Sequence, residues 1–319
     1  MPATDQSAAL AEAAPPTAVA APRRRALSPA ATTWLALGTV YVVWGSTYLG
    51  IRVAVRTIPP FVMGGARFVL AGILLYAIAR LRGAPRWVSV RELLSCALAG
   101  TLLAAGGNGI VNLAERYIAS GPAALVIAAV PLWVVLMRRV TGERVSRATL
   151  ASVLTGFAGV ALLLAPGGGG GSDRTLGFLL VVCASFSWAL GSFLSPRLAL
   201  PADGLLSTAI QMTAGGLVLS IVAVASGEAS SFDPGAVSGD SLLAFAYLVA
   251  IGSLVAYTAY VWLLRNAPIS RVATYAYVNP AIAIFLGWLI LAERVTITTL
   301  AGAAVVIASV AVTVRKETG

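Results

Sequence analysis

The sequence predicts an all-α integral membrane protein with ten transmembrane helices arranged as two inverted five-helix repeats. Three observations predict this class: 59% of the 319 residues are apolar, only 11% are charged, and the apolar residues form ten long segments. A soluble domain is about 45–50% apolar and about 25% charged, so this chain lacks the polar surface that water requires. We therefore expect lipid to be its natural solvent.

Each apolar segment has 18 to 24 residues, the length of a helix that crosses a hydrocarbon core of about 30 Å. Strands of a membrane barrel would be shorter and would alternate apolar with polar residues. In chain order the expected helices are 34–51, 61–79, 93–114, 117–137, 148–165, 175–196, 204–226, 241–264, 272–292 and 295–314.

The segments between and around these helices define the domain plan. The first 30 residues are rich in Ala and Pro and cannot bury enough surface to offset the entropy of ordering. The first apolar segment is longer than that of a usual signal peptide, so we expect it to be retained. The plan is a disordered cytoplasmic tail at 1–30, a first repeat at 31–165, a glycine-rich linker at 166–174, a second repeat at 175–314 and a cytoplasmic tail at 315–319.

The distribution of basic residues predicts the orientation. Arg67 is the only charged residue inside a segment, and sixteen of the 22 Lys and Arg lie on the side that the two termini share. The positive-inside rule then places both termini in the cytoplasm and the chain in the inner (plasma) membrane as a multi-pass protein. The net charge of +10 forms no basic face interleaved with aromatics, so no nucleic acid is expected as a partner. The expected partners are the lipid bilayer and a small-molecule substrate, and a homodimer stays open.

Composition also argues against most enzyme chemistry. The chain has no histidine, which excludes a Ser/His/Asp or Cys/His triad, a His-ligated metal and an imidazole proton shuttle. Cys96 and Cys183 lie in apolar runs, where a thiol behaves as a small hydrophobe. The glycine-rich linker lacks the Gly-Lys-Ser/Thr ending of a phosphate-binding loop. We expect no catalysis, no cofactor and no metal.

Spacings in the first five helices recur in the second five. Arg116 precedes Pro131 by 15 residues, and Arg265 precedes Pro280 by the same 15. Since each half has an odd number of spans, the second copy must enter the membrane from the opposite side. Inverted repeats of this kind are typical of transporters, whose halves exchange inward-open and outward-open shapes around a shared site.

Five stretches carry a family resemblance: Trp44–Tyr48, Gly65–Phe68, Gly107–Gly109, Tyr275–Pro280, and the Glu-Arg pairs that follow Gly142 and Ala292. In these stretches the chain resembles the EamA family of the drug/metabolite transporter superfamily, over roughly residues 31–314. The resemblance implies a secondary transporter with ten helices, cytoplasmic termini and export of small amphipathic metabolites such as amino acids, aromatic compounds or drugs by alternating access. Two alternatives stay open: an integral membrane enzyme acting on lipid, and a non-transporting membrane scaffold.

Arg67 costs about 2.5–3.5 kcal/mol near a helix centre on insertion scales and should face the bundle interior. Its guanidinium could hold a carboxylate or other anionic group of the substrate. It could equally form a structural link to helix-end carbonyls or to a loop carboxylate. Its counterpart in the second half is Gln211, because each precedes a glycine by five residues.

Asn108 and Asn112 share one helical face, which Glu115 continues towards the outer mouth. The amides could line a translocation path, or they could form hydrogen bonds between helices. The repeat spacing pairs Asn108 with Tyr257, which favours a lining role. Glu115 and Glu293 are acids at the membrane edge beside arginines, so proton coupling is poorly supported and uniport or exchange is the simpler prediction.

Aromatic and hydroxyl side chains share faces at mid-span depth and could clamp an amphipathic solute, although helix packing or an interfacial belt is the more common explanation for any single aromatic. They are Trp44 with Tyr48, Trp188 with Ser192, and Ser253 with Tyr257 and Tyr260. Pro131 and Pro280 interrupt the fourth and ninth helices and are candidate hinges, or else fixed kinks. Near the second proline, Tyr275 and Asn279 should face the same region.

Overall fold

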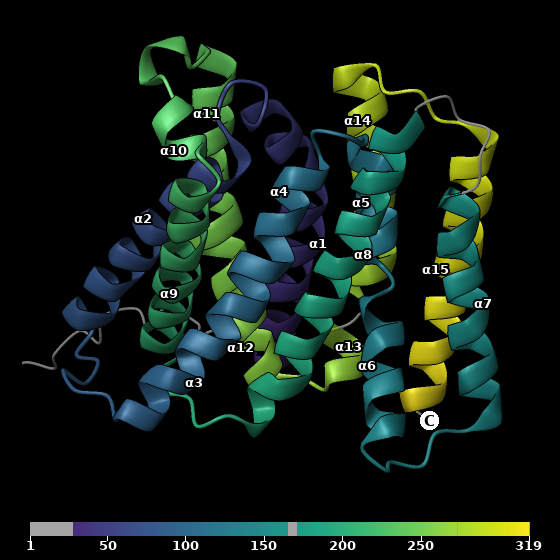
Figure 1. Ribbon diagram of the computed structural model, residues 1–319. Helices are drawn as coiled ribbons and strands as arrows, with labels where there is room; N and C mark the ends of the chain where they lie inside the picture. The colour runs from purple at the N-terminus through teal and green to yellow at the C-terminus, as the bar shows by residue number, and fades with distance from the viewer. Residues whose placement is uncertain (1–27, 165–170, 273, 319) are drawn as a thin grey trace, which may run out of the picture.

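A computed structural model of the protein describes residues 28–164, 171–272 and 274–318, in which every regular element is a helix (Figure 1). Residues 1–27 of the expected N-terminal tail, 165–170 around the expected linker, Ala273 and Gly319 lie outside the described residues. Seven helices are long and apolar enough to cross a membrane: Ala30–Ala54, Pro60–Leu81, Val90–Ala114, Ser120–Val140, Ser172–Arg197, Gly204–Ala225 and Gly239–Asn266. Three shorter apolar helices join them: Arg147–Leu162, Val278–Leu291 and Ile297–Val312.

The first half of the chain contains the helices α1 (Pro29–Ala54), α2 (Pro60–Leu81), α3 (Val90–Gly100), η1 (Thr101–Gly109), α4 (Ile110–Ala114), α5 (Ser120–Ile127), α6 (Val130–Val140) and α7 (Arg147–Leu164). The segments α3, η1 and α4 follow one another without a gap, and η1 is wound as a π-helix. They therefore make one membrane-length helix with a wide turn in its middle.

The second half contains α8 (Gly171–Leu194), η2 (Ser195–Arg197), α9 (Gly204–Ala225), α10 (Glu228–Ser231), η3 (Pro234–Ala236), α11 (Gly239–Tyr247), η4 (Leu248–Tyr257), α12 (Thr258–Asn266), α13 (Ile269–Val272), α14 (Tyr275–Leu291) and α15 (Ile297–Thr318). Here α11, η4 and α12 again form one continuous helix, and η4 is a second π-helix. The described part of the chain thus has a π-helical segment in the third span and in the eighth.

Local capping explains where several helices begin. Ser28 caps α1 by accepting a hydrogen bond from the Ala31 backbone at 3.2 Å, and a proline follows at the first position. Ser89 and Glu92 form a reciprocal capping box at the start of α3. Because these caps precede the apolar runs, the helices begin several residues before hydropathy alone places them.

Two expected helices differ from the structure. The fourth, expected at 117–137, is divided into α5 and α6 by a turn at Ala128 and Ala129. Pro131 has no N–H for an intrahelical bond, so it is accommodated in the first turn of a new helix. The ninth, expected at 272–292, corresponds to α14, which begins at Tyr275 and has Pro280 inside it, while Val272 ends the separate short helix α13.

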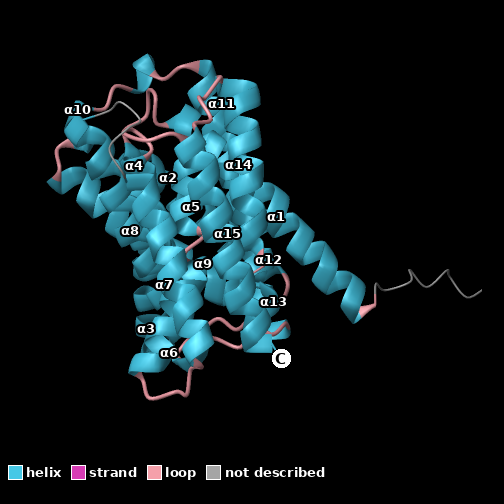
Figure 2. Cartoon of the chain, turned by 90° about the vertical axis from the view of Figure 1, so that its right-hand side faces the viewer, coloured by secondary structure: helices cyan, strands magenta, loops and turns pink. Residues whose placement is uncertain are grey.

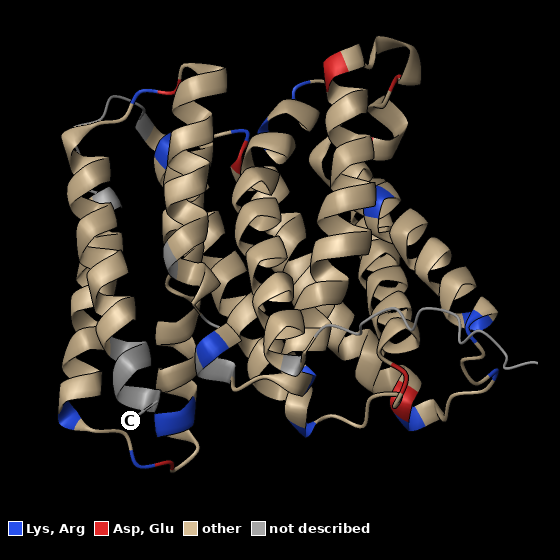
Figure 3. Ribbon diagram, turned by 180° about the vertical axis from the view of Figure 1, so that it is seen from behind, with Lys and Arg blue, Asp and Glu red and all other residues tan. Residues whose placement is uncertain are grey.

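The helices pack as a bundle in which elements from the two halves alternate (Figure 1). α2 packs along α9, and α7 packs along α15 at the edge of the bundle. The beginning of α1 and the end of α15 lie at the same end of the bundle in both views (Figures 1 and 2). More of the described Arg residues lie at that same end than at the opposite one (Figure 3).

Candidate functional site

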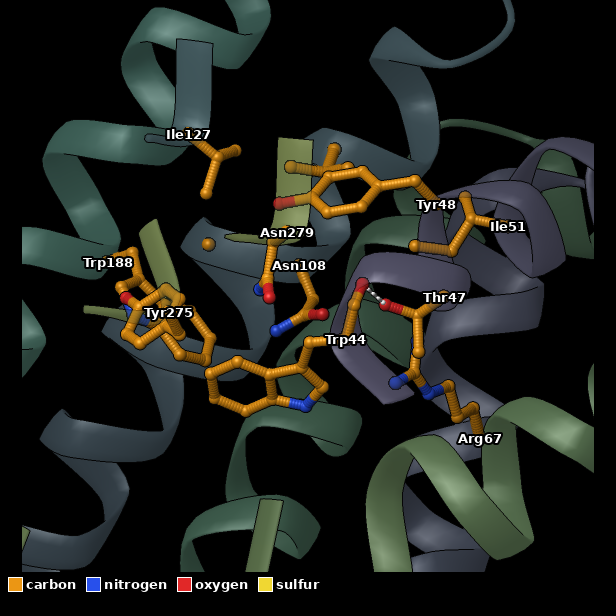
Figure 4. A pocket seen from close by; sticks show the side chains of 12 residues that line it. Trp44, Thr47, Tyr48, Ile51, Arg67, Asn108, Ile127, Trp188, Tyr275 and Asn279 are labelled. Atoms are coloured by element: carbon orange, nitrogen blue, oxygen red, sulfur yellow. Dashed lines mark hydrogen bonds between the residues drawn. The ribbon is translucent and has the colours of Figure 1, made fainter. Parts of the chain in front are cut away.

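A cavity of about 50 Å³ lies between the helices of the bundle (Figure 4). Helices of both halves contribute to it: α1, α2, η1, α4, α5, α8 and α14. Its lining residues are Trp44, Thr47, Tyr48, Ile51, Arg67, Gly107, Asn108, Val111, Ile127, Trp188, Tyr275 and Asn279. We call this the central cavity.

One wall of the central cavity is aromatic. The ring centroid of Trp44 lies 5.4 Å from that of Trp188 and 5.5 Å from that of Tyr275, in edge-to-face geometry with both. α1 brings Tyr48 to the same cavity because residues four apart share a helix face. Such rings offer a large apolar surface with few rotatable bonds, which suits the apolar body of a solute.

Arg67 on α2 places a cation against the cavity. Its side chain is 2% exposed, and its Nε donates to Ser253 Oγ at 2.8 Å. The guanidinium carbon lies 4.8 Å from the centroid of the Phe68 ring, while Nη1 has no hydrogen-bond partner within the described ranges. No described Asp or Glu forms an ion pair with it. The guanidinium therefore has donor capacity left for an anionic group.

Two amides line the cavity, Asn108 from η1 and Asn279 from α14 (Figure 4). Asn108 donates to the backbone carbonyl of Leu103 at 3.3 Å. With its nitrogen turned towards them, the Asn279 amide donates to the carbonyls of Tyr41 at 3.1 Å and Tyr275 at 3.3 Å. Both amides thus keep an oxygen available for a donor on a ligand.

The π-helical segments position part of this site. Gly107 and Asn108 lie in η1, while Ser253 and Tyr257 lie in η4. A π-turn widens the helix and displaces the side chains that follow it, and π-turns frequently occur at functional sites. At Gly107 the backbone passes so close to Trp188 that an added methyl carbon would lie 2.6 Å from the indole ring.

Other predicted residues lie behind the aromatic wall rather than on the cavity surface. Tyr260 packs with its centroid 4.7 Å from Trp44 and bonds Ser192 through its hydroxyl at 3.0 Å. Tyr257 is 2% exposed, lies 6.5 Å from Trp44 between centroids, and has no partner for its hydroxyl. We call Trp44, Trp188, Tyr257, Tyr260 and Tyr275 the aromatic cluster.

Gln211 and Asn112 do not line the central cavity. Gln211 donates to Ser207 Oγ at 3.0 Å and lines a second cavity of about 230 Å³ together with Arg265 and the loop that follows α8. That loop lies at the end of the bundle that carries the C-terminus (Figure 1). Asn112 on α4 is fully buried, and neither its amide nitrogen nor its oxygen has a partner among the described residues.

Sequence reasoning missed five of the lining residues. They are Thr47, Ile51, Gly107, Val111 and Ile127. Thr47 and Ile51 share a face with Trp44 and Tyr48, so helical periodicity from those two aromatics could have found them. Valine and isoleucine are too common in this chain for their identity to give a signal. Among the described residues, no three Cys, Asp or Glu side chains lie close enough together to hold a metal ion.

Comparison with known proteins places the chain among transporters. The model of the EamA-like transporter family matches residues 32–165 and again 175–315. The chain is 41% identical over 253 residues to the uncharacterized inner membrane transporter YedA of Escherichia coli strain K12, covering 79% of this chain and 80% of that protein.

Two further relatives are more distant. An uncharacterized transporter of Archaeoglobus fulgidus is 29% identical over 89% of this chain and 98% of its own length. A WAT1-related chloroplastic protein of Arabidopsis thaliana is 25% identical over 87% of this chain and 68% of its own length. One solved crystal structure matches with a TM-score of 0.63 at 19% identity, covering 88% of this chain and 97% of that one, which shows a shared fold.

Proposed function

The chain belongs to the EamA-like transporter family, and from this premise we propose that it exports small amphipathic metabolites across the inner membrane by alternating access between two inverted five-helix repeats. The chain is a multi-pass inner-membrane protein by its relatives and by its apolar helices. The observation that carries the proposal is the central cavity, in which a buried cation faces an aromatic wall.

The inverted repeat is supported by reciprocal contacts between equivalent helices. A methyl carbon added at Gly72 would lie 2.8 Å from the backbone nitrogen of Thr213, and one added at Gly216 would lie 2.6 Å from that of Val69. Residue 216 follows residue 72 in the sequence by the same number of positions as residue 213 follows residue 69. Residues 72 and 216 are therefore equivalent in the two halves, as are 69 and 213, and the second contact is the first with the two helices exchanged. Such reciprocity is expected where two related elements pack about a two-fold axis.

The contact between α7 and α15 has the same property. A methyl carbon added at Gly159 would lie 3.1 Å from Val306, and one added at Gly156 would lie 3.2 Å from Ser309. Residues 156 and 159 are separated from 306 and 309 by the same number of positions. This second reciprocal pair supports an axis that relates all five helices of each half.

Alternating access is supported by the two cavities and the aromatic cluster. Trp44, Trp188 and Tyr275 of the cluster border the central cavity. Val261, next to Tyr260 in sequence, borders the second cavity at the C-terminal end of the bundle. If the aromatic cluster opens to one end of the bundle while it is closed to the other, and then exchanges these states, a solute passes from one cavity to the other without a continuous pore.

The substrate class follows from the chemistry of the lining. A carboxylate or other anion on the solute would accept from the free Nη1 of Arg67, and an apolar or aromatic body would rest on Trp44 and Tyr275. The larger share of Arg at the end that carries the C-terminus supports a cytoplasmic location for that end (Figure 3).

Flux measurement in reconstituted vesicles tests the proposal. Vesicles that contain the protein are loaded in turn with radiolabelled amino acids and aromatic amines, and efflux is compared with that from empty vesicles. We expect protein-dependent, saturable efflux for at least one class. Efflux equal to that of empty vesicles for every class would contradict carriage.

A further inference from the structure

Glu115 is a buried acid that the cavity does not use. It follows the last residue of the span Val90–Ala114 and is fully buried. Neither carboxyl oxygen has a hydrogen-bond partner among the residues that the structure describes. Arg52 on α1 donates to the backbone carbonyl of Glu115 instead of to its carboxylate. The sequence suggested an acid at the membrane edge beside Arg116, whereas the structure places it in the interior.

The elements around Glu115 offer little compensation for a negative charge. α1 contributes Arg52 and the hydroxyl of Tyr48, and α2 packs against α4 through Gly64, which has no side chain. η1 has no titratable residue between Thr101 and Gly109. A single nearby cation is therefore the whole favourable contribution from these elements.

The remaining neighbours are occupied elsewhere. Glu293, between α14 and α15, accepts from the backbone nitrogen of Ser120 at 3.1 Å and from its hydroxyl at 2.8 Å, at the first residue of α5. α8 packs against residues 114–118 through Gly177, and the guanidinium of Arg174 lies 5.1 Å from the centroid of Phe178. The charge of Glu293 adds repulsion to the charged form of Glu115.

An ionised carboxylate that is buried without hydrogen bonds is far less stable than one in water, whereas the neutral acid loses much less on burial. Burial raises the pKa of the Glu115 carboxyl well above its usual range, Arg52 opposes this rise, and Glu293 adds to it. The packed arrangement therefore favours the protonated acid. If the proton leaves, the carboxylate needs water, and the helices around it must separate to admit it.

Glu115 is connected to the central cavity by polar groups. Asn108 lines the cavity, and Asn112 follows it by about one turn with both amide atoms unpartnered. Tyr48 lines the same cavity and lies close enough to Glu115 for the two groups to interact electrostatically. A change at Glu115 can therefore reach the cavity wall through α1 and α4.

We propose that Glu115 is a proton-binding site of the transporter, protonated while α4 is packed and deprotonated when the helices around α4 separate. In this step the O–H bond of the Glu115 carboxyl breaks, the proton passes to water, and the electron pair stays on the carboxylate. The effect of Glu115 on transport rests on the proposed function. If the protein is a transporter, its flux should depend on the pH of the side of the membrane opposite the C-terminus. Proton binding itself does not require a known substrate.

Infrared spectroscopy of the whole protein in detergent tests the site directly. Exposed carboxyls are ionised at pH 7, so a carboxylic acid C=O band that persists there reports a buried protonated acid. We expect this band in the wild type, its loss in Glu115→Gln, and its retention in the control Glu143→Gln. Glu143 is a matched control because it pairs with Arg138 at 2.6 Å on a partly exposed surface. A band absent from the wild type, or unchanged in Glu115→Gln, would overturn the proposal.

Thermal unfolding gives a second reading. The pKa of Glu115 in the folded protein is raised above the unfolded value of about 4.3, so the folded state binds the proton more tightly. Tm should therefore fall as the pH rises from the unfolded pKa to the folded pKa. Glu115→Gln should flatten that dependence and melt above the wild type at pH 7, while Glu143→Gln keeps the wild-type slope. If Glu115→Gln does not fold, Glu115→Asp should retain the band with a shifted midpoint, and an unshifted midpoint would overturn the assignment. Absence of flux with the band intact would refute the proposed function and leave the proton site standing.

Discussion

Arg67 is the residue whose surroundings constrain the site most closely. Its guanidinium is buried, yet in the described part of the chain it has a single side-chain hydrogen bond, to Ser253, and one ring contact, with Phe68. A cation at this depth is destabilising on insertion scales by about 2.5–3.5 kcal/mol. A bound anion would offset much of that cost, which ties the stability of this side chain to ligand binding.

Replacement of Arg67 by Gln, the residue at the equivalent position of the second repeat, tests this role. We expect transport of an anionic substrate to weaken by about 10- to 100-fold in apparent affinity, since a hydrogen bond to a charged group contributes about 1.5–3 kcal/mol. Melting should not fall, because a buried charge is removed. The exposed Arg56→Gln is the control, and equal affinity in the two variants would contradict the assignment.

The sequence identified the candidate polar residues more readily than it predicted where they lie in the bundle. Arg67 and the mid-span amides are rare residues in an apolar chain, so composition alone singles them out. The burial of Glu115 could not be predicted, because its neighbour Arg116 suggested an exposed pair. Only the packing of α1, α2 and α8 around α4 removes that acid from water.

At the scale of elements, hydropathy predicts the helices well, because a span needs about 20 apolar residues and its ends are marked by charges. Each of the ten expected segments overlaps a helix of the structure. Hydropathy does not reveal the turn at Ala128 and Ala129, or the π-helical η1 and η4. Those features depend on neighbouring helices and leave no periodic signal.

The crossing of α2 and α9 gives a prediction for paired glycines. Gly72→Ala and Gly216→Ala should both lower Tm, by similar amounts, because each added methyl meets the backbone of the opposite helix. Gly38→Ala on α1 is the control, since no heavy atom lies within 4 Å of its added carbon, and it should be neutral or stabilising by up to about 1 kcal/mol. Tolerance of both Gly72→Ala and Gly216→Ala would argue against the reciprocal contact.

Pro280 gives a second prediction at this scale. Pro280→Ala restores an N–H inside α14, where proline is disfavoured by about 3 kcal/mol in a helix interior. If Pro280 is a hinge, the variant should melt higher and transport more slowly, measured as Tm and initial efflux rate. A raised Tm with an unchanged rate would identify a fixed kink instead.

At the scale of the whole molecule, the family resemblance predicted from five short stretches is confirmed by the family match across both halves. Helical content and membrane-length spans are confirmed as well. The substrate could not be predicted, because the central cavity is formed by residues from seven helical segments whose relative depth no single sequence specifies. The proposed mechanism requires that the central cavity can be reached from either side of the membrane in turn.

Access of a thiol reagent to Asn108→Cys, in a chain that carries Cys96→Ala and Cys183→Ala, tests the central claim most directly. Asn108 lies in the cavity between the halves. Two inverted repeats that alternate around it predict that a membrane-impermeant reagent modifies this thiol both in right-side-out and in inside-out vesicles. Modification from one side alone, or from neither, would contradict alternating access.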